Sequence, residues 1–232
     1  CNGTEHSVQK EVVQTPACNE YPPSNLILTA LLDAKVRVKY TDNAFSETGF
    51  EIQYSLNGST WFTYTTVSEN TTVVITTSLL FNTEYWFRVR NIGTCDTRWS
   101  SVVSILTGPK PVTFVEAFAT GNIETLLVSW IDDNNNHAVA NPVTYEVEAA
   151  LTSGACASST FKHCSDVSAP LNNYTITNCM LDSSYNVRVR SKNKNNVVSS
   201  WSNIPAFVNV TPVVGGPIVD GNYASKCAFW IN

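Results

Sequence analysis

The side chains with the most reactive chemistry in this sequence are three histidines, seven cysteines and a few neighbouring carboxylates. His6, His137 and His163 are far apart, and none has a metal ligand or an acid–base partner at a fixed spacing. No G-x-S-x-G nucleophile motif and no glycine-rich phosphate loop occurs. Asp132 and Asp133 open the stretch "DDNNN", but its oxygens do not follow the register of a calcium loop. The sequence therefore predicts no catalytic residue, no metal site, no cofactor and no enzyme activity.

The cysteines indicate disulfide chemistry in an oxidising compartment. They lack the C-x-x-C spacing and the nearby histidine pairs of zinc sites. The seven positions are Cys1, Cys18, Cys95, Cys156, Cys164, Cys179 and Cys227. Because seven is an odd number, at least one cysteine is free, capped or bonded to another chain.

Five N-x-S/T sequons point to the same compartment, because this motif accepts N-linked glycans in secreted proteins. They begin at Asn2, Asn57, Asn70, Asn173 and Asn209. A charged fraction of 14% and a net charge of −5 argue against a nucleic-acid partner. No apolar run approaches the length of about 18 residues that a membrane span needs, so none is expected in this chain. We expect an extracellular protein, secreted or at the cell surface.

Two stretches of the sequence are nearly repeated, "EYWFRVRN" at 84–91 and "SYNVRVRS" at 184–191. Around them, "VRVKYTDN" is matched by "LLVSWIDD", and "RWSS" is matched by "SSWS". Short alternating runs between turn residues predict an all-β chain. Proline makes "GPKP" at 108–111 a stiff boundary. The predicted organisation is a tail (1–20), a first domain (21–109), a second domain (110–212) and a second tail (213–232).

Strand alternation predicts which of the repeated residues face the core. Along 84–90 and 184–190 the odd-numbered residues face inward, whereas the even-numbered ones, including both R-V-R arginine pairs, face outward. The Asn57-Gly58 pair lies between two alternating runs. Both residue types tolerate positive φ, so the pair predicts a type I′ hairpin turn.

The two repeats resemble fibronectin type III domains. In that family a tryptophan on the second strand packs in the core, together with a leucine six residues before a tyrosine that staples the preceding loop. The matching residues are Leu79 and Tyr85 in the first repeat, and Trp130 and Tyr185 in the second. Tyr40 replaces the tryptophan in the first repeat, and Cys179 replaces the leucine in the second. The resemblance implies two immunoglobulin-like (fibronectin type III) sandwiches in tandem.

In that fold the last strand lies beside the strand that carries the arginines. The resemblance therefore implies a ladder of arginines stacked on tryptophans. Its expected members are Arg88, Arg90, Trp99, Arg188, Arg190 and Trp201. "RWSS" and "SSWS" are also similar to half of the W-S-x-W-S signature of cytokine receptors. The ladder either stabilises the sheets or serves as a hot spot for a protein ligand.

The topology implied by the resemblance narrows the cysteine pairings without fixing them. The expected pairs are Cys18–Cys95, Cys156–Cys164 and Cys179–Cys227, which leaves Cys1 for another chain. Alternatively, Cys179 is a buried thiol, and Cys1 and Cys227 are then both available for partners.

Both tails carry apolar residues, which dock either on their own domains or on a neighbouring copy. Our first hypothesis is a non-enzymatic, glycosylated structural protein whose tails link copies into a fibre or surface homopolymer. The residues expected to make these intermolecular contacts are Cys1, Cys227, Phe229 and Trp230. The alternative is the ectodomain of a cell-surface receptor or adhesion protein that binds a protein ligand. A third hypothesis is an accessory module of a secreted hydrolase.

Overall fold

Alternating side chains make this chain a succession of β-strands. The structure, a computed structural model, describes residues 21–77, 79–93, 98–120, 124–132, 141–153, 156–158, 160–202, 206–210 and 230. Within these residues the strands are β1 (Ser24–Ala30), β2 (Val36–Thr41), β3 (Glu47–Ser55), β4 (Phe62–Ser68), β5 (Val73–Ile75), β6 (Glu84–Gly93), β7 (Val103–Leu106), β8 (Thr113–Ala119), β9 (Leu126–Ile131), β10 (Val143–Leu151), β11 (Lys162–Ser168), β12 (Asn173–Ile176), β13 (Ser183–Asn193) and β14 (Ala206–Val210). Among the helices of this described part, none is long and apolar enough to cross a membrane.

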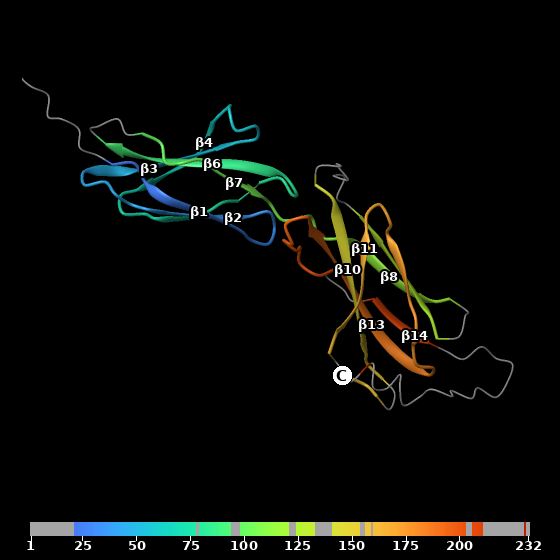
Figure 1. Ribbon diagram of the computed structural model, residues 1–232. Coiled ribbons are helices and arrows are strands. Elements are labelled where there is room, and N and C mark those ends of the chain that lie inside the picture. The colour runs from blue at the N-terminus through green and yellow to red at the C-terminus, as the bar shows by residue number, and fades with distance from the viewer. Residues whose placement is uncertain are drawn as a thin grey trace, which may run out of the picture.

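The strands form two sandwiches, each made of a three-stranded and a four-stranded antiparallel sheet (Figure 1). In the first domain the order β1-β2-β5 packs against β4-β3-β6-β7. In the second domain β12-β9-β8 packs against β11-β10-β13-β14. This is the strand arrangement of the fibronectin type III fold, which confirms the predicted fold class. The stretch 108–111 lies between β7 and β8.

The core of the first domain contains the inward-facing residues of both sheets. In β6, Tyr85, Phe87 and Val89 are buried, and the residues between them are only partly buried. The same alternation runs along β13, so the predicted facing of both strands is confirmed. Tyr40 of β2 packs on Phe50 of β3 with ring centroids 5.1 Å apart. Tyr40 thus fills the core position that the family gives to tryptophan.

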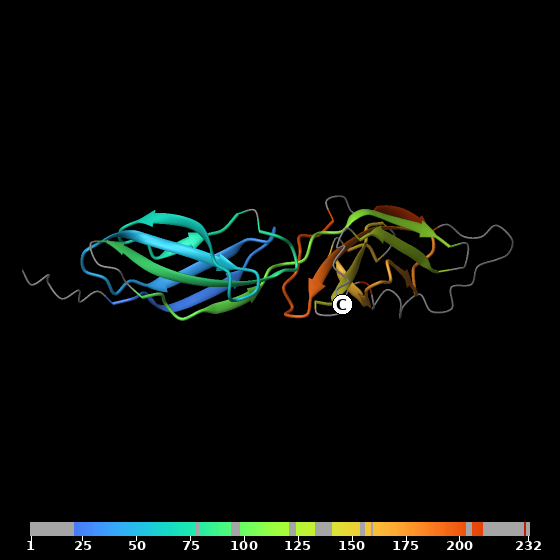
Figure 2. The same cartoon turned by 90° about the horizontal axis from the view of Figure 1, so that it is seen from above.

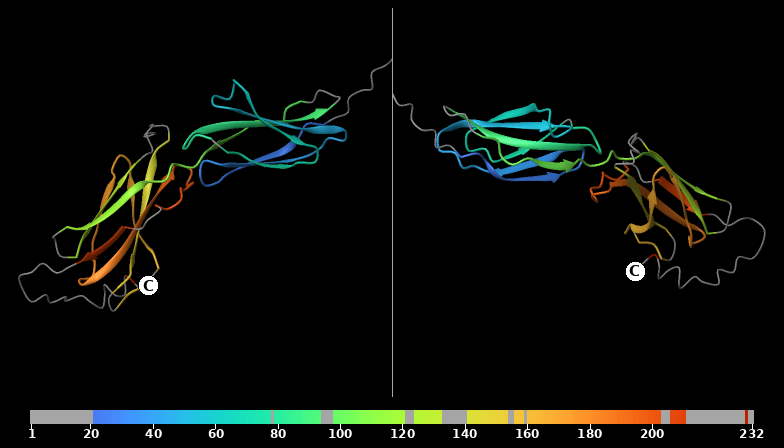
Figure 3. Two further views of the ribbon diagram at one scale, coloured as in Figure 1. Left: turned by 180° about the vertical axis from the view of Figure 1, so that it is seen from behind. Right: turned by 45° about the horizontal axis from the view of Figure 1, so that its top comes forward.

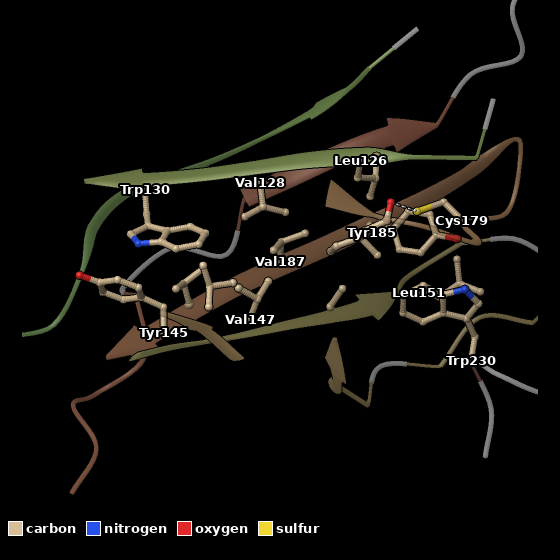
Figure 4. Close-up of a cluster of buried hydrophobic side chains, with 14 of the residues drawn as sticks. Leu126, Val128, Trp130, Tyr145, Val147, Leu151, Cys179, Tyr185, Val187 and Trp230 are labelled. Atoms are coloured by element: carbon tan, nitrogen blue, oxygen red, sulfur yellow. Dashed lines mark hydrogen bonds between the residues drawn. The ribbon is translucent and has the colours of Figure 1, made fainter. Parts of the chain in front are cut away.

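The core of the second domain has an aromatic pair at each end (Figure 4). Trp130 of β9 packs on Tyr145 of β10 at one end, with ring centroids 5.2 Å apart. Tyr185 of β13 packs on Trp230 at the other end, at 5.0 Å. Cys179 lies beside Tyr185 and is fully buried, at the position where the first domain has Leu79.

A tyrosine hydroxyl fastens the loop before β6 and the corresponding loop before β13. The Leu80 N–H donates to the Tyr85 hydroxyl at 3.0 Å, and the Met180 N–H donates to the Tyr185 hydroxyl at 2.6 Å. Each bond connects a loop to the inner face of the following strand, so the loop is fixed relative to the core.

The connection between β3 and β4 differs from the predicted type I′ turn. Gly58 has a positive φ of 72°, but Asn57 does not share it, and the connection is longer than two residues. The Asn57 Oδ1 instead accepts hydrogen bonds from the backbone N–H groups of Ser59 (2.9 Å) and Thr60 (2.8 Å). The asparagine side chain therefore organises this loop in place of a tight backbone turn.

A hydrogen-bonded joint connects the two sandwiches, which lie end to end (Figure 2). Asn82 and Asn141 bond reciprocally, because the Nδ2 of each donates to the backbone oxygen of the other, at 3.0 and 3.2 Å. The Asn193 Nδ2 donates to the Thr107 backbone oxygen at 3.0 Å. We call these four residues, together with Gly108, the interdomain joint.

The chain that joins the two domains passes directly from one to the other (Figure 3), and Gly108 in this segment lies close to both of them. A Cβ atom at this position would lie 3.4 Å from Val197 Cγ1 of the second domain and 3.5 Å from the Leu31 backbone oxygen of the first. The Asn193 Oδ1 also accepts the Val197 N–H at 3.1 Å, which ties the loop after β13 to the joint. A change in the angle between the domains would therefore break buried hydrogen bonds.

Replacing Tyr185 with phenylalanine removes the acceptor of the buried Met180 N–H. We expect Tyr185→Phe to lower the free energy of unfolding by about 1–3 kcal/mol, the cost of an unsatisfied buried donor. Tyr85→Phe is the matched control, and its cost should be only about 0.5–1.5 kcal/mol because the exposed Leu80 leaves its N–H accessible to water. Urea unfolding measures both, and a larger loss for Tyr85→Phe would contradict this account.

Candidate interaction surface

The outer face of the β4-β3-β6-β7 sheet carries a stack of alternating aromatic rings and guanidinium groups. The Arg88 guanidinium lies 4.1 Å from the ring centroids of both Trp61 and Trp99. Arg90 lies 4.7 Å from the ring centroid of Trp99, on the same strand as Arg88. The order of the stack is therefore Trp61, Arg88, Trp99 and Arg90.

The second domain repeats this stack on the outer face of β11-β10-β13-β14. Arg188 lies 4.0 Å from the Phe161 centroid and 4.2 Å from the Trp201 centroid. Arg190 lies 4.3 Å from the Trp201 centroid. The structure thus brings together all six residues of the expected ladder, three in each domain.

Acceptors on the neighbouring central strand hold each arginine in place. Glu51 of β3 lies directly opposite Arg90, and Gln53 lies opposite Arg88. The Arg90 Nε donates to the Glu51 Oε2 at 2.8 Å, and the Arg88 Nη2 donates to the Gln53 Oε1 at 2.7 Å. Burial raises the pKa of Glu51, but hydrogen bonds from Thr63, Gln53 and Arg90 and the charge of Arg90 hold that pKa below its ordinary value.

In the second domain both acceptors are carboxylates. The Arg188 Nη2 lies 2.6 Å from the Glu148 Oε2, and the Arg190 Nε lies 2.5 Å from the Glu146 Oε2. The Lys192 Nζ adds a contact of 3.0 Å to Glu146. Burial raises the pKa of Glu146, but the hydrogen bonds and charges of Lys192 and Arg190 outweigh that effect and lower it.

The outer aromatic of each stack and all four acceptors were not predicted from the sequence. A signal for both was present in the repeat itself. Trp61 and Phe161 are separated by the same interval as Arg88 and Arg188, and the segments "EIQ" and "EVE" precede the arginines in both domains. Alternate polar residues on a strand opposite R-V-R fit cross-strand charge pairing.

The contacts within the stacks fit a structural role better than a ligand-binding role. The arginines are paired with carboxylates or an amide of their own sheet, and the rings already stack on guanidinium groups. A ligand would have to displace these contacts in order to use the same groups. Stacking and charge pairing across four strands instead stabilise the sheet.

The cysteines differ from the expected pairings in two respects. Cys156 is disulfide-bonded, whereas Cys164 and Cys179 are thiols. The expected Cys156–Cys164 and Cys179–Cys227 bridges are therefore wrong, and the alternative of a buried Cys179 thiol is correct. Burial raises the pKa of Cys164 to about 11. Cys1, Cys18, Cys95 and Cys227 lie outside the described residues.

Trp230 was expected to contact another chain, and the structure corrects this. Its side chain is 0% exposed, and the indole Nε1 donates to the Asn178 backbone oxygen at 3.3 Å. The ring fills one end of its own domain's core, where a large apolar side chain is most stable. Phe229 lies outside the described residues.

Three of the five sequon asparagines have described side chains, and all three are exposed. Asn57 lies in the β3–β4 connection, Asn70 in the β4–β5 turn with a φ of 60°, and Asn173 at the start of β12. Asn209 lies on β14, for which the structure describes the backbone, and Asn2 is outside the described residues.

Two further surface features stand out in the described part of the chain. An open hollow of about 630 Å³ lies at the outer pole of the first domain and is lined by Tyr21 and Phe45. Several large apolar side chains are also exposed on the three-stranded sheet of the second domain, Phe118 and Ile131 among them. Within the described residues, no group of three or more His, Cys, Asp or Glu side chains is placed to hold a metal ion.

No family model and no curated protein matches this chain by sequence. The structure matches 425 solved chains, among them the crystal structure of the FN1–FN3 domains of chicken CNTN1. That match has 12% sequence identity and a TM-score of 0.43, and it covers 83% of this chain and 69% of the other. The fold itself is established by the strand order of the two sandwiches.

Acidification should weaken the stack of the second domain. Because the pKa of Glu146 is lowered in the folded state, its contribution is present above its ordinary pKa of 4.5 and is lost as the pH falls through the folded value. Glu146→Gln should lower stability at neutral pH by about 1–3 kcal/mol and should reduce the further loss on acidification. Urea unfolding as a function of pH tests this. The exposed Glu69→Gln is the control and should follow the unsubstituted chain.

Removing the Trp230 ring should destabilise the second domain although the residue lies far beyond its last strand. We expect Trp230→Ala to cost about 3–5 kcal/mol, as for other large-to-small core substitutions. Phe114→Ala, at a position that is 77% exposed, should change stability by no more than about 0.5 kcal/mol. Calorimetry can follow the second domain separately. Unchanged unfolding of Trp230→Ala would contradict the docking of this residue.

Proposed function

We propose that this chain is a non-enzymatic extracellular module of a receptor-like or adhesion-like ectodomain. Its task is to hold two sandwiches in one fixed orientation, so that a protein ligand bound by one domain is kept at a set position relative to the other. The observation that carries the proposal is the interdomain joint. Two domains that move independently on a loose linker would not be expected to form reciprocal side-chain hydrogen bonds between them.

The joint supports this function because its bonds come from four separate segments. Asn82 precedes β6, Thr107 follows β7, Asn141 precedes β10 and Asn193 ends β13. The Ser191 hydroxyl also donates a hydrogen bond of 2.5 Å to the backbone oxygen of Lys110 in the connecting chain. A bend at the joint would separate these donors from their acceptors. Each buried polar group left without a hydrogen bond costs about 1–3 kcal/mol.

The Cys156 disulfide supports an extracellular location, because such bonds persist in oxidising compartments. The three exposed sequon asparagines are placed where a glycosylating enzyme can reach them. The surface arginines support a scaffold role, since they are bonded within their own sheets.

Self-association is a second candidate function, favoured by the number of cysteines. Two of the seven are thiols, so five remain, and an odd number cannot be fully paired within one chain. A disulfide between copies would use the remaining cysteine. This proposal now depends on Cys1, Cys227 and Phe229, because Trp230 is buried in its own domain.

Nuclear magnetic resonance can test the fixed orientation of the domains. Residual dipolar couplings from both domains should fit one alignment tensor in the unsubstituted chain, and two tensors in the Asn82→Ala, Asn193→Ala double variant. Independent tensors in the unsubstituted chain would refute the proposal.

Antibody labelling of intact and permeabilised native cells tests the location, and labelling only after permeabilisation would exclude an extracellular module. Sedimentation with and without reductant separates the two candidates, since covalent oligomers lost on reduction support self-association.

A further inference from the structure

The outer face of the second domain's three-stranded sheet carries exposed apolar side chains on both sides of a polar row. Phe118 of β8 is 51% exposed and Ile131 of β9 is 49% exposed. Phe118 pairs with Leu127 of β9, so the apolar side chains extend across neighbouring strands. The outward residues of this face are Glu116 and Phe118 on β8, Leu127, Ser129 and Ile131 on β9, and Asn173 and Thr175 on β12. Phe118 and Leu127 lie on one side of the polar row formed by Glu116, Ser129 and Asn173, and Ile131 lies on the other side. Exposed apolar groups of this size are candidates for a covering group.

The corresponding face of the first domain has positively charged side chains beside its exposed apolar ones. There the central strand β2 directs Arg37 and Lys39 outward, opposite Ile75 and Val73 of β5. The matching rows of the second domain have no cation, and their one charged side chain is Glu116, opposite Ser129. They consist of Leu127 opposite Thr175 and Ser129 opposite Asn173.

We propose that Asn173 carries an N-linked glycan whose first sugars cover the apolar face beside it. The sequon Asn173-Tyr174-Thr175 therefore takes the place of the two cations of the first domain. This inference rests on the extracellular location proposed above.

The geometry around Asn173 fits this modification. Asn173 and Thr175 are both exposed and lie on the same face of β12, while Tyr174 points to the core. The Asn173 Nδ2 makes only a long contact of 3.5 Å, to the Asn172 Oδ1, within the described residues. In contrast, the Asn57 carboxamide is bonded within its own loop through both atoms, because its Nδ2 donates to the Thr60 Oγ1 at 3.3 Å and its Oδ1 accepts backbone N–H groups. Asn173 thus presents an accessible amide nitrogen.

The reach of the glycan fits the apolar residues on both sides of its attachment point. Asn173 lies opposite Ser129, so Leu127 and Ile131 are its diagonal neighbours, at about 7–8 Å between backbones. The C–H groups of a pyranose ring pack favourably on aliphatic groups and on the negative face of an aromatic ring. The first two sugars would therefore lie over Leu127 or Ile131 and extend toward Phe118.

The covalent step needs one co-reactant, an oligosaccharide linked to a lipid pyrophosphate. A bond forms between the Asn173 Nδ2 and the anomeric carbon of the first sugar, and the bond from that carbon to phosphate breaks. The nitrogen loses one proton, and the lipid pyrophosphate leaves. No oxidation or reduction occurs.

Matched sequon variants of the full chain, secreted from a eukaryotic cell line, test the inference. Thr175→Ala destroys the sequon and leaves Asn173 in place, whereas Thr175→Ser keeps the sequon. Peptide mass spectrometry should find a glycan on Asn173 in the unsubstituted chain and in Thr175→Ser, and none in Thr175→Ala. The loss of this glycan should raise the fluorescence of an apolar dye and shift sedimentation toward larger species. Thr72→Ala, which removes the sequon at Asn70, is the control and should change neither readout.

Each outcome decides one statement. A bare Asn173 in a secreted chain with the Cys156 disulfide intact would overturn the glycan and leave the face open to a protein partner. A glycan whose removal changes neither dye binding nor sedimentation would overturn its covering role. A chain that is retained in the cell with Cys156 reduced would instead overturn the proposed extracellular function.

Discussion

The burial of alternate side chains along β6 and β13 is the constraint on which the rest of this structure depends. Each strand lies at the centre of a four-stranded sheet and bonds to a neighbour on both sides. Its inward residues fill the sandwich core, and the tyrosine at the start fixes the preceding loop. Because the strand alternates strictly, the two arginines must then emerge on the other face at a fixed spacing. The core thus determines where the surface charges lie.

Those charges are stabilised in the same way in both domains but with different partners. The first domain pairs its arginines with one carboxylate and one amide, and the second uses two carboxylates and adds Lys192. Aromatic rings on both sides of Arg88 and Arg188 limit the access of water to these two guanidinium groups, which strengthens their contacts. A repeat that keeps the arrangement while its partners change indicates that the sheet requires the stack as a whole.

The sequence predicted the features that depend on local pattern. Alternation and the repeat gave the fold class and the facing of β6 and β13, and the resemblance gave the core positions of Trp130 and Tyr185. Features that depend on side chains distant in sequence were missed. The Asn57-Gly58 pair predicted a tight turn, but the Asn57 side chain accepts hydrogen bonds from the backbone and organises a longer loop. The burial of Trp230 depends on contacts with Asn178 and Tyr185, which are far from it in the sequence and which no local spacing encodes.

The burial of Trp230 has a consequence for the order in which the chain folds. A ribosome releases the first domain in full while the second is still being made, so the first can close early. All strands of the second sandwich have been synthesised once β14 has emerged, but one end of its core still lacks the Trp230 side chain. Completion must wait until the polypeptide has been extended to Trp230. During that interval the unfinished domain exposes Tyr185 and Cys179 to solvent, and transiently exposed apolar surface of this kind is what chaperones bind.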